Sequence, residues 1–255
     1  FLHLIRTVPA NGNIIINADD SNLADVLEKG CWTPVTAFAQ QGHKTAEWQW
    51  QATSKDGSSF KLYHQGICVI ETTWGMLGIH NVANACAVAA AATLLGMLPD
   101  TIKAAFQSFT GIRRRMTLTG TAGGIRIFDD FAHHPTAIAT TLQGCRAKVG
   151  EGRILVVLEP RSNTMKRGVH KETLAASMSP ADPAFLYQAD NIDWDVEAAM
   201  AKVSLPISVL YQIDDVVDAV AAEVKPGDTV IVMSNGGFGG IHGKLLQRLE
   251  GVSTF

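Results

Sequence analysis

The feature that most constrains the fold is a series of short apolar segments in the second half of the chain. These segments are residues 126–131, 154–160, 184–187, 207–211 and 228–234. Each is rich in Ile, Leu, Val or Phe and precedes a stretch long enough for a helix. Strands that alternate with helices predict a parallel sheet covered on both faces. The sequence therefore predicts an α/β fold with a doubly wound, mostly parallel sheet.

The first half of the chain follows a different pattern. Phe1, Leu4, Ile5 and Val8 have the spacing of a helix face. Further elements are expected as a strand at 13–19, a helix at 21–29 capped by Asp20 or Ser21, a β-meander over 35–74, and helices at 81–95 and 100–109. The period changes near FTGIRRR, which predicts domains at 1–112 and 113–255. Because the chain opens on an amphipathic helix without a Met, we expect it to be a fragment.

Composition excludes several classes of partner. The formal net charge is -3 and 47% of the residues are hydrophobic, so no nucleic acid or membrane surface is expected as a partner. Cys31, Cys68, Cys86 and Cys145 are widely spaced. This spacing predicts buried, reduced thiols in a cytoplasmic protein rather than disulfides or a zinc site.

Three polar segments follow predicted strands. They are DDFAHH at 129–134, EPRSNTMK at 159–166 and SNGGFGG at 234–240. Ligands of doubly wound folds bind at the carboxyl ends of the strands. The sequence therefore predicts that these loops share one rim and form a binding site.

The segment DDFAHHPTAI admits more than one interpretation. A metal site needs several converging ligands, but adjacent residues on a strand end point apart, so Asp129 and Asp130 cannot both face one ion. The same holds for His133 and His134, which precede Pro135 at a helix start. We therefore expect no metal here and favour a nucleotide site, in which Asp130 accepts ribose hydroxyls beside a helix N-terminus.

The glycine-rich loop fits neither familiar phosphate motif. Its residues do not match G-x-G-x-x-G followed by an acid, and Phe238 and Leu245 depart from the P-loop pattern around Lys244. It remains a loop that lets the backbone approach a ligand closely, or a plain strand-to-helix turn.

Two further segments suggest nucleotide contacts. Asn81 and Asn84 lie three residues apart after His80, so they share a helix face and can either cap it or meet the edge of a purine. Arg113, Arg114 and Arg115 lie at the predicted boundary. They are either a solvated patch or a phosphate clamp between domains.

Together, the motifs GIHNVAN, FTGIRRRM, DDFAHHPT, EPRSNTMK and SNGGFGGIHGK resemble the Mur ligase family over essentially the whole chain. The resemblance implies that residues 1–112 are the latter part of a central ATPase domain and that 113–255 are a Rossmann-like C-terminal domain. It also implies ATP and Mg²⁺ as cofactors, with the P-loop and the metal ligands upstream of Phe1. This chain alone is then expected to be inactive.

The resemblance assigns roles by position. It implies catalytic roles for Arg115, His133 and His134. It places ATP on His80, Asn81, Asn84, Arg115 and Asp130, and the incoming peptide on Ser162, Asn163, Lys166, Ser234, Asn235 and Phe238. Thr117 departs from the family pattern, because an acid is expected after the Arg-Met pair.

The implied reaction is ATP-driven amide formation through an acyl phosphate. EPRSNTMK and SNGGFGG favour a member that joins UDP-N-acetylmuramate to a diaminopimelate-containing tripeptide, whereas DDFAHHPT alone also admits a member that uses L-alanine. A hinge near Gly111 would close the domains. The alternatives outside the family are a metal hydrolase using Asp130, His133 and His134, and a non-catalytic nucleotide- or peptide-binding module. The sequence does not predict an oligomeric state.

Overall fold

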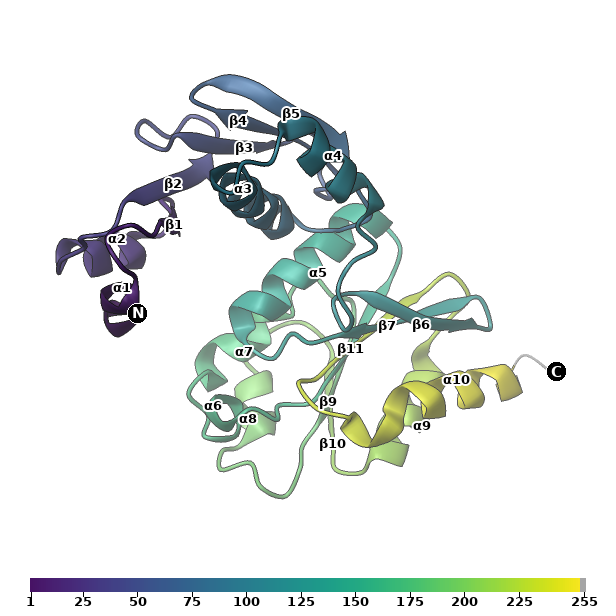
Figure 1. The fold of residues 1–255 in the computed structure, drawn as a ribbon. Coiled ribbons are helices and arrows are strands. Elements are labelled where there is room, and N and C mark those ends of the chain that lie inside the picture. Colours follow the sequence, from purple (N-terminus) through teal and green to yellow (C-terminus); the bar gives the residue numbers. More distant parts are fainter. Residues whose placement is uncertain (253–255) are drawn as a thin grey trace. The chain divides into compact units, whose positions relative to one another are not determined.

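The computed structural model describes residues 1–252 and divides into two compact units, Phe1–Thr110 and a second that begins at Gly111 (Figure 1). The elements of the first unit are α1 (Leu2–Thr7), β1 (Ile14–Asn17), α2 (Ser21–Glu28), β2 (Val35–Gln40), β3 (Trp48–Ala52), β4 (Ser59–His64), β5 (Ile67–Thr73), α3 (Ile79–Leu94) and α4 (Pro99–Ser108). The predicted helices and the first strand are confirmed. Asp20 caps α2 by accepting a hydrogen bond from the Asn22 amide.

The first unit contains a mixed sheet in the order β1-β2-β3-β4-β5. The predicted meander is confirmed for β3, β4 and β5, which are antiparallel. It is wrong for β2, which pairs parallel with both β1 and β3. Helix α2 carries the chain back between β1 and β2, so these two strands run in the same direction. The connection from β2 to β3, residues 41–47, contains no helix.

Helix α3 packs closely on this sheet because its inward face is made of small residues. Ala85, Cys86, Ala89 and Ala90 are all buried against a cluster that includes Trp48 and the aromatic and aliphatic side chains of β4. The Ala-rich sequence therefore acts as a packing surface, as its composition predicts.

The second unit contains the predicted doubly wound sheet. Its elements are β6 (Thr117–Ala122), β7 (Ile125–Asp130), α5 (Pro135–Val149), β8 (Ile154–Leu158), α6 (Asn163–Lys166), α7 (Lys171–Ser177), β9 (Ala184–Tyr187), α8 (Val196–Met200), β10 (Ile207–Leu210), α9 (Ile213–Glu223), β11 (Thr229–Met233), the 3₁₀ turn η1 (Phe238–Gly240) and α10 (Ile241–Val252). The strand order is β10-β9-β8-β11-β7-β6, and every pair is parallel except β6 with β7.

Strand β6 is absent from the sequence prediction. It forms a hairpin with β7 through Gly123 and Gly124, whose φ angles are 56° and 75°. Two glycines with positive φ are typical of a tight hairpin turn. This Gly-Gly pair was the signal that could have revealed β6.

Helices cover both faces of this sheet (Figure 1). In β8, Ile154, Val156 and Leu158 pack with α5, α7 and α8, whereas Leu155 and Val157 pack with α9 and α10. All residues of β8 are buried, as expected for a central parallel strand. Among the described residues, no helix is long and apolar enough to cross a membrane.

The cysteines are free thiols in different environments. Cys86 and Cys145 are buried, Cys31 is half-buried, and Cys68 is exposed, so the prediction of buried thiols is wrong for Cys68. Cys68 lies on β5, where alternate side chains face solvent. Burial raises the pKa of Cys86 to about 12 and that of Cys145 to about 11.

We predict that an aromatic disulfide reagent modifies the native protein first at Cys68. Cys86 and Cys145 should react only after unfolding, because the thiolate is the reacting species and burial suppresses it. Stopped-flow absorbance at neutral pH measures the phases, and Cys68→Ser is the matched control that should remove the fastest one. A fast phase that survives in this variant would contradict the assignment.

Candidate active site

The rim of the second sheet gathers the three polar loops. Asp130 at the end of β7 and Leu158 at the end of β8 both pair in register with Met233 at the end of β11. The loops that follow these strands therefore leave neighbouring positions on one edge. This confirms the predicted convergence, because the three strands run parallel side by side.

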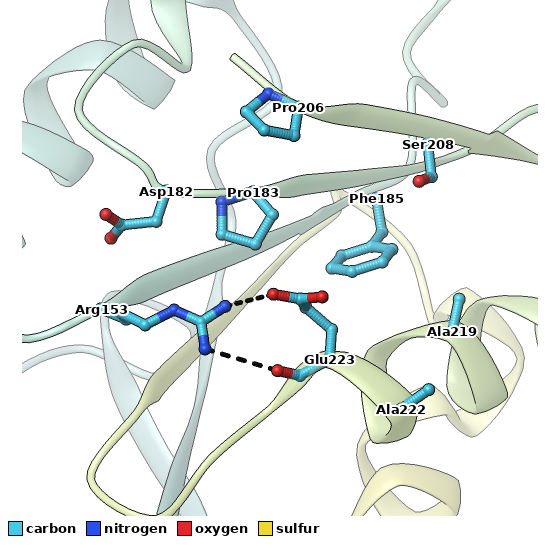
Figure 2. A pocket seen from close by; sticks show the side chains of 9 residues that line it. All are labelled: Arg153, Asp182, Pro183, Phe185, Pro206, Ser208, Ala219, Ala222 and Glu223. Carbon is cyan, nitrogen blue, oxygen red and sulfur yellow. Dashed lines mark hydrogen bonds and ion pairs between the residues drawn. The ribbon is translucent and has the colours of Figure 1, made fainter.

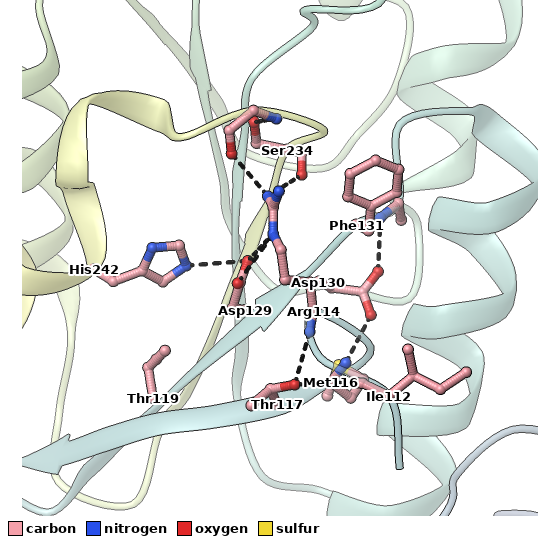
Figure 3. Close-up of polar contacts among 12 residues, drawn as sticks. Ile112, Arg114, Met116, Thr117, Thr119, Asp129, Asp130, Phe131, Ser234 and His242 are labelled. Atoms are coloured by element: carbon pink, nitrogen blue, oxygen red, sulfur yellow. Dashed lines mark hydrogen bonds and ion pairs between the residues drawn. The ribbon is translucent and has the colours of Figure 1, made fainter.

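Arg114 connects the loops after β7 and β11 (Figure 3). Its Nε lies 3.2 Å from Asp129 Oδ2, and its Nη2 donates to the carbonyl oxygens of Ser234 at 2.5 Å and Gly236 at 2.8 Å. Its guanidinium also lies 5.0 Å from the ring centroid of Phe131. One planar cation thus joins the β7 end to the β11 loop, a geometry suited to arginine.

Asp130 holds the turn that carries the arginines. Its carboxylate is 1% exposed, and its oxygens accept hydrogen bonds from the Met116 amide at 2.9 Å and the Ala132 amide at 2.8 Å (Figure 3). Burial raises the pKa of this carboxyl, while the two backbone donors and the charge of Arg115 oppose the rise. Asp129 and Asp130 therefore point to different partners, as predicted for adjacent strand residues.

Arg115 extends from this turn into solvent. It is exposed, and its guanidinium forms no hydrogen bond or ion pair with the described residues. The neighbouring backbone is fixed, because Arg114 and Met116 have φ angles of 60° and 50°. Thr117, which stands where an acid was expected, accepts a hydrogen bond from the Arg114 amide at 2.9 Å. The turn thus presents an unpaired cation on a constrained backbone.

The two adjacent histidines have separate environments. His133 Nδ1 lies 2.8 Å from the Phe131 carbonyl oxygen. His134 caps α5 by accepting from the Thr136 amide, and its ring meets His170 edge-on at 4.3 Å. Desolvation, with smaller contributions from His170 and His133, lowers the pKa of His134. Their predicted catalytic roles stay predictions.

The loop after β8 contains three of the predicted peptide contacts. Ser162 caps α6 by accepting from the Met165 amide, Asn163 is exposed, and Lys166 is half-buried. The hydroxyl of Ser162 is thus engaged, whereas the Asn163 amide is open to a ligand.

The loop after β11 contains the other three. Ser234 is 1% exposed, donates to Glu159 Oε2 at 2.5 Å and accepts from the Gly236 amide at 2.9 Å. Phe238 is also 1% exposed and packs in the core near Tyr187. Asn235 differs from both, because its Oδ1 is buried without a hydrogen-bond partner. Of the three, Asn235 is the side chain with unused hydrogen-bonding capacity.

The predicted adenine contacts lie together at the start of α3. Asn81 donates to the Leu77 carbonyl oxygen at 2.7 Å and accepts from Asn84 Nδ2 at 3.3 Å. Gly78 precedes them with a φ of 95°, and a side chain at this position would collide with the His80 ring. The three polar side chains therefore share one helix end, and their role in binding adenine stays a prediction.

Other places in the molecule offer less to a ligand. Within residues 1–252, no group of three or more His, Cys, Asp or Glu residues could hold a metal ion. A hollow of about 530 Å³ opens where β9 and β10 begin, at the edge opposite the rim (Figure 2). Its Arg153 pairs with Glu223 and Asp228. The charges in this hollow are therefore paired with one another. At the rim, by contrast, the Arg115 guanidinium and the Asn235 Oδ1 have no partner among the described residues.

Sequence reasoning missed several residues that organise the rim. Arg114 was placed in a surface patch or phosphate clamp, and Glu159, Arg161 and His242 were given no role. His242 Nε2 lies 3.4 Å from Asp129 Oδ1. The sequence offered little sign of this contact, because His242 lies in a helix more than a hundred residues after Asp129.

Comparisons with known proteins identify the family of the chain. Residues 114–236 match the Mur ligase glutamate ligase domain, and residues 1–92 match the Mur ligase middle domain. The chain therefore belongs to the Mur ligase family, whose members are ATP-dependent ligases that form amide bonds.

Individual members of the family differ in how similar they are to this chain. The chain is 43% identical to the UDP-N-acetylmuramate–L-alanyl-γ-D-glutamyl-meso-2,6-diaminoheptandioate ligase of Escherichia coli (strain K12), over 98% of this chain and 54% of that protein. It is 34% identical to a UDP-N-acetylmuramate–L-alanine ligase of Geobacter sp. (strain M21), over 69% of this chain and 38% of that protein. A crystal structure of a murein peptide ligase from Psychrobacter arcticus 273-4 has a TM-score of 0.76 and 38% identity, over 98% of this chain and 54% of that one. The chain thus spans about half the length of the Escherichia coli and Psychrobacter arcticus proteins.

We predict that Arg114→Ala destabilises the second unit. The change leaves the Asp129 carboxylate and two carbonyl groups without their donor, which should lower the free energy of unfolding by about 1–3 kcal/mol. Denaturation in urea measures the change, and Arg113→Ala is the matched control because Arg113 is exposed. Equal stability of the two variants would contradict the role given to Arg114.

We also predict a pH dependence of stability from His242. Burial lowers its pKa, helped by Arg114 and opposed by the Asp129 carboxylate. The unfolded chain then binds more protons than the folded protein below about pH 6.5, so stability falls as the pH decreases. Thermal unfolding across this range should show the fall, and His242→Gln should reduce it. His3→Gln, on an exposed residue of α1, should leave the slope as it is.

Proposed function

We propose that a protein containing this chain joins L-Ala-γ-D-Glu-meso-diaminopimelate to UDP-N-acetylmuramate at the expense of ATP, in murein recycling. The observation that carries the proposal is the 43% identity over nearly the whole chain to a ligase with this acceptor. The likeness to L-alanine ligases is weaker, with 34% identity over 69% of the chain in one case and 30% identity over 98% in another. We place this activity in the cytoplasm. The proposed domains are residues 1–112 and 113–255, with a hinge at Gly111, whose φ is 95°.

Arg115 acts on the phosphates in this proposal. The carboxylate of UDP-N-acetylmuramate attacks the γ-phosphate of ATP, which forms an acyl phosphate and releases ADP. The peptide amine then attacks the carbonyl carbon of the acyl phosphate, and the amide forms as phosphate leaves and the amine loses a proton. Carboxylate and phosphate repel each other, so an unpaired arginine can lower the barrier by neutralising charge. The exposed guanidinium of Arg115 suits this task. The described residues contain no group of three or more His, Cys, Asp or Glu that could hold Mg²⁺.

Asp130 has a double role in the proposal. Its two hydrogen bonds to backbone amides orient the turn that carries Arg115. A carboxylate can accept more than two hydrogen bonds, so a ribose hydroxyl remains its proposed ligand. His80, Asn81 and Asn84 are the proposed adenine contacts. His133 and His134 are proposed to orient the peptide or the intermediate, and the exposed Asn163 and the half-buried Lys166 to contact the peptide.

The test measures phosphate release by the complete protein that contains this chain. Release from ATP should require UDP-N-acetylmuramate and the tripeptide together, and L-alanine should not replace the tripeptide. Arg115→Ala should reduce kcat by about 10²–10³-fold, a typical effect of removing one charge-stabilising group. Arg113→Ala is the matched control and should retain activity. Phosphate release that is indifferent to the amine acceptor would contradict the proposal, and release with L-alanine would favour the alternative ligase.

A further inference from the structure

The turn between β3 and β4, residues 53–58, is unusual because its glycine is buried. Connections between strands almost always run over the surface, yet Gly57 is buried with a φ of 76°. A Cβ on Gly57 would stand 2.8 Å from the carbonyl carbon and oxygen of Gly78 and 3.2 Å from the Ile79 amide nitrogen. The turn therefore lies directly against the residue that precedes α3, and only glycine leaves room for this contact.

Hydrogen bonds join the same turn to the connection between β5 and α3. The Gly78 amide donates to the Asp56 carbonyl oxygen at 2.7 Å, and the Trp74 amide donates to the Ser58 carbonyl oxygen at 3.0 Å. The indole Nε1 of Trp74 donates to the Gly57 carbonyl oxygen at 2.9 Å. Three consecutive carbonyl groups of the turn thus hold both ends of this connection.

Side chains within the turn fix its shape. Asp56 Oδ1 accepts from the Ser58 amide at 3.1 Å and from the Ser58 hydroxyl at 2.7 Å. Ser54 Oγ accepts from the Ser59 amide at 2.9 Å. Such local bonds from Asp and Ser side chains to the backbone stabilise one turn conformation. A turn held in this way can in turn hold the backbone that packs on it.

The residue held by the turn determines where α3 starts. Gly78 has a φ of 95°, and its carbonyl oxygen accepts from the Asn81 amide at 3.0 Å. The His80 ring lies over Gly78, because a Cβ on this glycine would stand 2.5 Å from His80 Cε1. A displacement of Gly78 would therefore move both His80 and Asn81.

We infer that Gly57 and Trp74 are positioning residues for the nucleotide, which hold Gly78 so that the polar side chains at the start of α3 meet the edge of the purine. The inference rests on the proposed function, in which these side chains contact adenine. Gly57 and Trp74 act through the Gly78 backbone and not by contact with ATP. Binding energy from the base is the same in the ground state and the transition state, so its loss raises the KM for ATP without lowering kcat.

The experiment measures the steady-state kinetics of the complete protein with Gly57→Ala and with Gly66→Ala. Gly66 is the matched control, because it lies in the next turn of the same sheet with a φ of 81°, and a Cβ there would meet nothing within 4 Å. Both changes strain the backbone alike, but only Gly57→Ala pushes on Gly78.

Gly57→Ala should raise the KM for ATP about tenfold, the effect of one lost hydrogen bond to the base. It should leave kcat and the KM values for UDP-N-acetylmuramate and the tripeptide unchanged. Gly66→Ala should leave all of these constants unchanged.

Trp74→Phe examines the same connection without a change at a glycine. It removes the Nε1 donor to Gly57 but keeps an aromatic ring beside Phe60 and Phe106. Trp50→Phe is its control, since the buried Trp50 Nε1 has no hydrogen-bond partner among the described residues. The KM for ATP should rise about threefold in Trp74→Phe, the effect of one weak hydrogen bond, and stay constant in Trp50→Phe.

Equal KM values for ATP in Gly57→Ala and Gly66→Ala overturn the positioning role and leave the proposed ligase intact. A rise in Gly57→Ala that all three substrates share has the same consequence, because it reports a general loss of structure. If Gly57→Ala does not fold, the pair of tryptophan variants decides by the same comparison. A wild-type protein without ATP-dependent ligation overturns both proposals.

Discussion

The interaction on which the second unit depends is made by one arginine that joins three parts of the chain. Arg114 starts in the turn before β6, pairs with Asp129 at the end of β7, and donates to two carbonyl groups after β11. A guanidinium can do this because its donors lie in one plane and point in different directions. The loops after β7 and β11 thus share one anchor, which fixes their relative positions.

Asp130 complements this anchor from the other side of the strand. The carboxylate is buried, yet both of its oxygens accept backbone amides, which offsets the cost of removing the charge from water. The consequence for function is indirect. The side chains of Arg114 and Asp130 form the hydrogen bonds that fix the turn. Arg115, which follows Arg114 in this turn, remains unpaired among the described residues and available to an anion.

The remaining loops show the same division between supporting and available groups. Ser234 and Phe238 are buried and fully engaged in the loop and the core, whereas Asn235, Arg161 and Asn163 retain unused capacity. Gly236 leaves room for the Arg161 guanidinium next to the backbone, because a Cβ at this position would collide with it. A loop built in this way can be specific for charge and shape, because its supporting groups hold the others in place.

The sequence by itself determined the strands, the helices, the two-sided sheet and the gathering of polar loops at its carboxyl edge, because local periodicity and parallel strand direction suffice for these. It did not determine the parallel pairing of β2, the hairpin of β6 or the burial of Phe238. Nor did it show that Arg114 has a structural role, although the family resemblance singled out its neighbour Arg115 for the phosphates. Only the tertiary structure decided which of the two faces Asp129 and the β11 loop, since these partners lie 15 and about 120 residues away.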